Sequence, residues 1–248
     1  MGVLPYVAAK EIVETYRPIA YSLEKQLKRR VLLYTARDFK TFVERTRQGE
    51  YDVLLTAPHL AWLASDKPGY VPILKHARPV RGLLVARADA PFESLASLRG
   101  QTVASPTSVA LVVLAIQSDL AAQGLKSDVD YASTTAVTHV NAAMQVVNRR
   151  VAAAILAQQP YSMIRPEFRS QLRILHQTRA LPGLVYLTHP ALSPQESDAI
   201  RIALLKFADS AKGKVFLQRG NHDALNPVTA NDLLAMKPYA QQAQERLK

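Results

Sequence analysis

Short apolar stretches alternate with amphipathic ones along almost the whole chain, and this alternation constrains the fold more than any other feature. An apolar run of four to eight residues between turn signals predicts a buried strand. Such runs are VLLYTA (31–36), YDVLLTAP (51–58), YVPILKHA (70–77), GLLVARA (82–88), TVAS (102–105), VDYAST (129–134), VAAAIL (151–156), RILHQT (173–178) and LVYLTH (184–189). We therefore predict an α/β fold with mainly parallel sheets flanked by helices.

Helical periodicity fills most of the intervals between these runs. Four predicted helices cover residues 10–28, 38–49, about 138–149 and 232–247. Another is the long apolar stretch that begins directly after Ser108 and stops at Gly124, and one more starts at Pro194. The helix at Pro194 has the clearest start signal, because Ser193 is a good N-cap and Glu196 stands three residues later.

Composition excludes several classes of protein. The 248 residues suit one large domain or two lobes, and no run of about 18 apolar residues is present to span a membrane. The chain has no cysteine, which rules out disulfides, thiolate catalysis and zinc–thiolate sites. The start of the chain lacks the basic and apolar regions of a secretory signal.

The net charge of +11 points to an anionic partner: nucleic acid, an anionic surface or a small anion. The densest basic cluster is KQLKRR (25–30), at the end of a predicted helix. Cations favour helix C-termini, and no known nucleic-acid motif accompanies the cluster. We interpret it as a solvated helix end, so no nucleic-acid partner is expected.

Ligands of open α/β sheets bind beyond the carboxyl ends of the strands. Five segments follow predicted strands in this way and are rich in hydroxyls, His and Tyr but poor in carboxylates: 5–6, 56–59, 105–108, 134–139 and 158–161. In the stretch ASPTSVALVVL, Ser105, Thr107 and Ser108 stand at the predicted helix start. They predict either a plain helix cap or an anion site made of hydroxyls and free N–H groups.

Several motifs in this order resemble a known family. They are GVLPYVAAKEIVETYRPIAYSLEKQL at the start, GEYDVLLTAPHLAWLA, FESLASLRGQTVASPTSVA, TTAVTHVNAAMQVVNRRVAAAIL, and the C-terminal run from LSPQESDAIRIALLKF to KPYAQQAQERL. Each motif is weak alone. In this order and spacing they resemble the periplasmic phosphonate, phosphite and phosphate-type substrate-binding proteins of ABC transporters, over nearly the whole chain.

The resemblance implies a two-lobe fold of the type II periplasmic-binding-protein class, hinged by two crossover strands and closing on a ligand. Lobe I would comprise residues 1–82 and 185–248, and lobe II residues 83–184. It further implies a monomer that captures a small anion between the lobes and delivers it to an ABC permease in the membrane, with no cofactor and no metal.

The same resemblance suggests ligand-binding residues, each with a plainer alternative. Thr107 and Ser108 match the family's anion-holding helix start, with Ser105 just before them, although capping alone would also explain them. His139 matches a His at the next helix start and could donate to an anion oxygen; otherwise it is an exposed helix-start residue.

The remaining candidates come from other segments. Tyr6 and His59 match cleft-facing positions of lobe I, although both could simply pack in the core. Arg78 and Arg81 lie at the first crossover and could pair with an anion, although both could be ordinary surface arginines. Tyr161 ends the last hydroxyl-rich segment and, with Trp62, could face an apolar tail of the ligand.

The sequence departs from the family pattern at three positions. Arg149 and Ala152 replace a Gly and an Asp after the second-lobe helix, and Val109 replaces a glycine after the hydroxyls. Because Ala152 removes the acid that the family pattern offers, and a buried ammonium needs a carboxylate, we predict a ligand without an amine.

Three other functions are weighed against transport. A sensor input domain of a membrane receptor would share the fold, and the residues after Lys248 in the gene would reveal it. An enzyme is disfavoured because the chain has no Gly-x-Ser-x-Gly, phosphate loop, His-Glu-x-x-His or carboxylate pair at a pocket. A cytosolic regulator would carry a helix-turn-helix, and none is found in the sequence.

Overall fold

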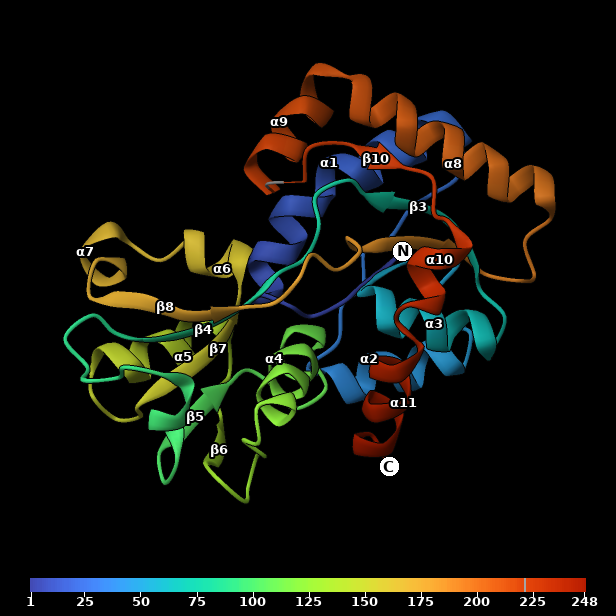
Figure 1. Ribbon diagram of the computed structural model, residues 1–248. Helices are drawn as coiled ribbons and strands as arrows, with labels where there is room; N and C mark the ends of the chain where they lie inside the picture. Colours follow the sequence, from blue (N-terminus) through green and yellow to red (C-terminus); the bar gives the residue numbers. More distant parts are fainter. Residues whose placement is uncertain (221) are drawn as a thin grey trace. The chain divides into compact units, whose positions relative to one another are not determined.

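The predicted α/β class with two sheets is confirmed. The computed structural model describes residues 1–220 and 222–248. The chain forms two compact units (Figure 1). Unit 1 comprises Met1–Pro79 and Pro182–Gln241, and unit 2 comprises Val80–Leu181 and Gln242–Lys248.

The unit boundaries differ from the proposed lobe boundaries chiefly at the C-terminus. The first two breaks lie a few residues before 82 and 184, but the last seven residues group with unit 2 and not with lobe I. The chain therefore passes from one unit to the other a third time, inside helix α11 (Lys237–Arg246).

Unit 1 is built on a five-stranded sheet in the order β1-β2-β9-β3-β10. Its strands are β1 Gly2–Val3, β2 Val53–Thr56, β3 Val71–His76, β9 Val185–Thr188 and β10 Leu225–Asn226. Only β1 and β2 pair in parallel. The other three pairs are antiparallel.

Two groups of helices cover this sheet. The first group is α1 Ala9–Leu27, α8 Pro194–Asp209 and α9 Ala211–Gly220, and the second is α2 Phe39–Arg47, α3 Pro58–Asp66 and α10 Ala230–Leu234. Figure 1 shows the two groups on opposite sides of β3 and β9. Residues of α1 at helical spacing, Ile12, Tyr16, Ile19 and Leu23, enter the core with residues of the sheet and of α8.

Unit 2 has a second five-stranded sheet in the order β6-β5-β7-β4-β8. The strands are β4 Gly82–Arg87, β5 Thr102–Ser105, β6 Ala132–Thr135, β7 Ala153–Ala157 and β8 Leu172–Gln177. The pairs β6–β5 and β5–β7 are parallel, whereas β4 runs antiparallel to both β7 and β8.

The helices of unit 2 are the 3₁₀ turn η1 Leu95–Leu98 and the α-helices α4 Leu111–Ala122, α5 His139–Val147, α6 Gln158–Ser162 and α7 Pro166–Arg169. Side chains alternate between the two faces of a strand. Leu83, Val85 and Leu156 pack into the cluster around α5. Gly82 faces the other side of the strand from Leu83. It lies so close to α4 that an added Cβ would be 3.1 Å from Ile116. The two helices therefore cover opposite faces.

Both sheets are mixed, so the expectation of mainly parallel sheets is wrong. The parallel strands of each unit follow one another through helices, as βαβ connections require: α1 and α2 lie between β1 and β2, α4 between β5 and β6, and α5 between β6 and β7. The strands that enter a sheet at a boundary between the units, β4 and β9, have no such helix and run antiparallel to their neighbours.

Several local predictions also need correction. Residues 31–36 form no strand; one bridge joins Tyr34 to Gly2, through Val3 N–H to Tyr34 O at 2.8 Å. The last predicted helix is two helices, α10 and α11, and α9 was not predicted at all. By contrast, Ser193 and Glu196 form the predicted capping box of α8.

Candidate functional site

Three loops meet at one edge of the unit 2 sheet. Because β6, β5 and β7 are parallel, their carboxyl ends lie at the same edge. The N–H of Ala136 donates to the carbonyl of Ser105 at 2.8 Å, which joins the loops after β6 and β5. The N–H of Ala157 donates to Nδ1 of His139 at 3.2 Å, which joins the end of β7 to the start of α5. Ser105 and His139 are thus brought to one edge.

Arg81 belongs to the same edge because β4 is antiparallel to β7 and begins where β7 ends. The N–H of Gln158 donates to the Arg81 carbonyl at 3.0 Å. The half-buried guanidinium of Arg81 donates to the carbonyl of Thr178 at 3.4 Å, a long hydrogen bond. This side chain is therefore only lightly held by protein groups.

The hydroxyl-rich segment is a loop and not a helix start. Helix α4 begins at Leu111, its N-cap is Ala110, and no side chain caps it. The N–H of Ala110 instead donates to the Thr107 carbonyl at 3.3 Å and closes a turn before the helix. The interpretation of these hydroxyls as an N-cap of α4 is therefore wrong, whereas an anion site at Thr107 and Ser108 stays a prediction.

The hydroxyls of this loop differ in exposure. Ser105, the last residue of β5, is 7% exposed. Thr107 is half-buried and Ser108 is exposed.

His139 is the first residue of α5 and is only 6% exposed, so it is not the exposed helix-start residue of the plainer alternative. Thr138 caps the helix by accepting from Asn141 N–H at 3.1 Å. Burial lowers the pKa of His139 to about 4. Since Nδ1 accepts the Ala157 N–H, the neutral ring carries its proton on Nε2 and can donate one hydrogen bond there.

Tyr161 lies in the short helix α6, which follows β7 directly. Its ring is partly buried and packs against the apolar cluster around α5. Part of this ring therefore serves the core of unit 2.

In unit 1, Tyr6 and His59 follow the two parallel strands β1 and β2. The N–H of Leu4 donates to the Leu55 carbonyl at 3.0 Å, so the chain after β1 stays beside β2. The Tyr6 hydroxyl lies 3.0 Å from the hydroxyl of the fully buried Tyr16, and burial raises the Tyr6 pKa. His59, in the first turn of α3, has no exposed surface at all.

One acidic side chain near these residues was missed. Glu11, in the first turn of α1, acts on Tyr6 electrostatically and contributes to its raised pKa, after burial. Glu11 is exposed. The sequence offered one signal for it: Glu11 stands five residues after Tyr6, at the start of a predicted helix.

Ala152 does not belong to the candidate site. Its N–H donates to the Thr102 carbonyl at 3.0 Å; Ala152 directly precedes β7, and Thr102 is the first residue of β5. They line a surface depression with Arg149 and Asp89 at the amino ends of the parallel strands. An acid at position 152 would point to the wrong edge of the sheet, so the argument from Ala152 about the ligand's charge fails.

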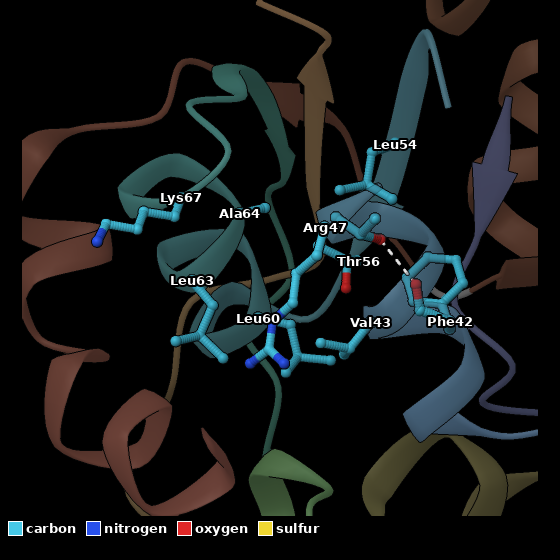
Figure 2. Close-up of a pocket in the computed structure, with 10 residues that line it drawn as sticks. Phe42, Val43, Arg47, Leu54, Thr56, Leu60, Leu63, Ala64 and Lys67 are labelled. Carbon is cyan, nitrogen blue, oxygen red and sulfur yellow. Dashed lines mark hydrogen bonds between the residues drawn. The ribbon is translucent and has the colours of Figure 1, made fainter. Parts of the chain in front are cut away.

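A small cavity in unit 1 was not predicted either. Figure 2 shows it between α2, α3 and β2, with Phe42, Leu54 and Leu60 among its apolar lining and Arg47 and Lys67 at its sides. Its free volume is about 10 Å³, which admits no more than one water molecule. None of the predicted site residues lines it, and it is too small for a ligand.

A buried histidine pair in unit 1 also escaped the sequence analysis. The rings of His76 and His222 lie with centroids 3.8 Å apart, and His76 Nε2 is 3.3 Å from the Tyr186 hydroxyl. Burial, and for His76 the neighbouring His222, lowers both pKa values; that of His222 falls to about 4. The two residues are so far apart in the sequence that no local pattern could pair them.

The described part of the chain contains neither a candidate membrane span nor a candidate metal site. None of its helices is long and apolar enough to cross a membrane. Among those same residues, no group of three or more His, Asp or Glu side chains is arranged to hold a metal ion.

Solved structures of other proteins share this fold. A binding protein component of an ABC phosphonate transporter from Pseudomonas aeruginosa is 17% identical, with a TM-score of 0.85 over 100% of this chain and 87% of that chain. PhnD1 from Prochlorococcus marinus, solved with methylphosphonate, is 12% identical, with a TM-score of 0.87 over 98% and 97%. A Xanthomonas citri protein solved with ATP is 20% identical, with a TM-score of 0.83 over 100% and 98%.

At these identities the solved structures establish the fold alone. The family follows from the sequence itself. The model of the family described as "ABC transporter, phosphonate, periplasmic substrate-binding protein" matches residues 1–233. This match covers nearly the whole chain, so the protein belongs to the periplasmic phosphonate-binding family of ABC-transporter components.

Proposed function

We propose that this protein binds a small oxyanion, such as a phosphonate, phosphite or phosphate, and delivers it to an ABC permease in the membrane. The observation that carries the proposal is the convergence of Ser105, His139 and Arg81 at the carboxyl edge of the unit 2 sheet. It brings a hydroxyl, a neutral ring N–H and a guanidinium to the same edge.

This combination suits an oxyanion. An oxyanion accepts several hydrogen bonds, and an Arg guanidinium supplies charge-assisted ones. His139 stays neutral at physiological pH, so it donates without adding a second charge. Thr107 and Ser108 are proposed to donate hydrogen bonds from the loop, and Tyr161 is proposed to contact the ligand with its ring. Tyr6 and His59 are the proposed ligand-binding residues of unit 1.

The proposed partner and compartment follow from the family. Its members are periplasmic binding components of ABC transporters, which bind and release their cargo without changing it. We therefore expect binding without turnover and a location outside the cytoplasmic membrane. The ligands named for the solved relatives, methylphosphonate in one case, set the first probes to try.

The test is a thermal-shift screen of phosphate, phosphite, methylphosphonate and larger phosphonates, followed by calorimetry. A ligand present at 100 times its Kd should stabilise the protein by about 2.7 kcal/mol. Thr107→Ala with Ser108→Ala should then weaken binding by about 1–3 kcal/mol. Because neither hydroxyl caps α4, the double variant should keep the thermal stability of the unliganded protein.

The control is Ser193→Ala, which removes the capping box of α8 in unit 1. It should lower stability by about 1 kcal/mol and leave affinity unchanged. No stabilisation by any oxyanion, or chemical conversion of one, would contradict the proposed function. Equal affinity of the double variant and the wild type would remove Thr107 and Ser108 from the site.

A further inference from the structure

Arg246, at the end of α11, is fastened to the hydroxyl loop. Its guanidinium donates to the Ser108 carbonyl at 2.6 Å and to Oε1 of Gln117 at 2.9 Å. Gln117 lies in α4 and donates in turn to the Ser127 hydroxyl at 3.2 Å. One arginine therefore ties the loop before α4, and α4 itself, to the C-terminal helix.

The last turn of α11 is itself anchored. Ala243 has no exposed surface and Leu247 is 8% exposed, so the face bearing these residues is buried while Arg246 stays at the surface. The N–H of Leu247 donates to the Ala243 carbonyl at 3.0 Å, which keeps the turn helical. The residues Gln242–Lys248 group with unit 2, as the loop does.

The contact acts on the loop through one peptide group. The Ser108 carbonyl and the Val109 N–H belong to the same planar trans peptide and point in opposite directions. By holding the carbonyl, Arg246 also fixes the direction of that N–H. No side chain caps α4, so the Arg246 contact holds the loop together with the turn from Ala110 N–H to the Thr107 carbonyl and the burial of Val109 and Ala110.

We infer that Arg246 is a positioning residue for oxyanion binding: it holds the loop 106–110 in the conformation that presents Thr107 and Ser108 to the ligand. This inference rests on the proposed function for its ligand. It names a residue outside the candidate site, at the far end of the sequence, as a determinant of affinity.

Three variants test it. Arg246→Gln loses the charge and the guanidinium, Arg246→Lys keeps a charged donor, and Arg201→Gln is the matched control. Arg201 is a half-exposed arginine of α8, paired with Asp198 at 2.8 Å, so its variant loses the same charge away from the loop. The readouts are amide hydrogen exchange of the unliganded protein and calorimetry with methylphosphonate.

In Arg246→Gln, amides 107–111 should exchange at least tenfold faster than in the wild type and in Arg201→Gln. The Kd for methylphosphonate should rise about tenfold, which corresponds to about 1.4 kcal/mol. Arg246→Lys should recover part of both effects. Thermal stability should be the same in Arg246→Gln and Arg201→Gln, which separates positioning from a general structural role.

Unchanged exchange of the loop amides in Arg246→Gln would overturn the inference, whether or not methylphosphonate binds. An affinity equal to that of Arg201→Gln would overturn it as well, because only net charge would then matter. Failure of the wild type to bind any oxyanion would instead contradict the proposed function, and the exchange data would still decide whether Arg246 holds the loop.

Discussion

Arg149 illustrates how a residue that departs from a family pattern can be explained by backbone conformation. It follows the C-cap of α5 with a φ of 59°, in the left-handed region that favours glycine. The family resemblance places a glycine here. The structure thus explains that glycine by backbone conformation, and the replacement changes a turn at the amino edge of the sheet.

This explanation predicts the ranking of two variants. Arg149→Ala removes the ion pair with Asp89, at 2.6 Å, and keeps the unfavourable φ. Arg149→Gly removes the same ion pair and relieves the φ. The glycine variant should therefore be about 1 kcal/mol more stable than the alanine variant.

Chemical denaturation of both variants is the measurement. The affinity for any oxyanion should equal that of the wild type in each, because position 149 lies away from the carboxyl edge. Equal stability of the two variants would contradict the backbone explanation.

At the scale of elements, the proposed site at the carboxyl edge of the unit 2 sheet leads to a prediction about the charge of the ligand. The segments 105–110, 136–139 and 158–161 contain no Asp or Glu. A buried ammonium without a carboxylate partner is very unfavourable. We therefore still predict a ligand without an amine, now from these segments and not from Ala152.

A matched pair of ligands tests this prediction: ethylphosphonate should bind more tightly than 2-aminoethylphosphonate by calorimetry. Glu11 is the acid to examine if the order is reversed, because it acts on Tyr6. A preference for the amine that disappears in Glu11→Gln would show that this carboxylate reaches the ligand. A preference that survives in Glu11→Gln would require another acid.

The elements also show what a sequence can and cannot predict. The capping box at Ser193 and Glu196 was predictable because both residues lie within one helical turn. The strand expected at 31–36 fails because a strand needs a partner, and only Tyr34 finds one. Strand β9 lies between β2 and β3 in the sheet but more than 100 residues after them in the sequence. Its antiparallel pairing with both could therefore not be predicted from local patterns.

The candidate site divides in the same way. Ser105 and His139 share one edge because of a general rule about the carboxyl ends of parallel strands, and that rule needs only the order of elements. Arg81 joins them for another reason: it precedes β4, which runs antiparallel to β7, and this pairing was not predicted. The burial of His59 and His139 and the Arg246 contact depend on packing between distant segments. No local pattern contains that information.

At the scale of the whole molecule, buried neutral histidines should make the protein sensitive to acid. The pKa values of His139 and His222 are lowered to about 4, and that of His76 is also lowered, all chiefly by burial. Below the unfolded value of about 6.5, the unfolded chain binds protons that the folded protein does not. The free energy of unfolding should therefore fall as pH drops from about 6.5 towards 4.

At pH 5 the loss should be on the order of 2 kcal/mol for each of His139 and His222, whose pKa values are about 4. Urea denaturation at a series of pH values measures it. His222→Asn should flatten the slope between pH 6.5 and 4, since one of the titrating groups is gone. A wild-type stability that stays level down to pH 5 would show that these side chains are protonated in the folded state.

The edges of the two sheets bear on how copies of this protein meet one another. An open edge strand with unpaired backbone groups invites pairing with a second chain, and proteins avoid this with short or charged edges. In unit 1 the edge strands β1 and β10 have two residues each. In unit 2, β6 is the short polar strand ASTT, and β8 carries Arg173 and His176. The sheets therefore offer a neighbouring copy little backbone to extend, which favours solubility at high concentration.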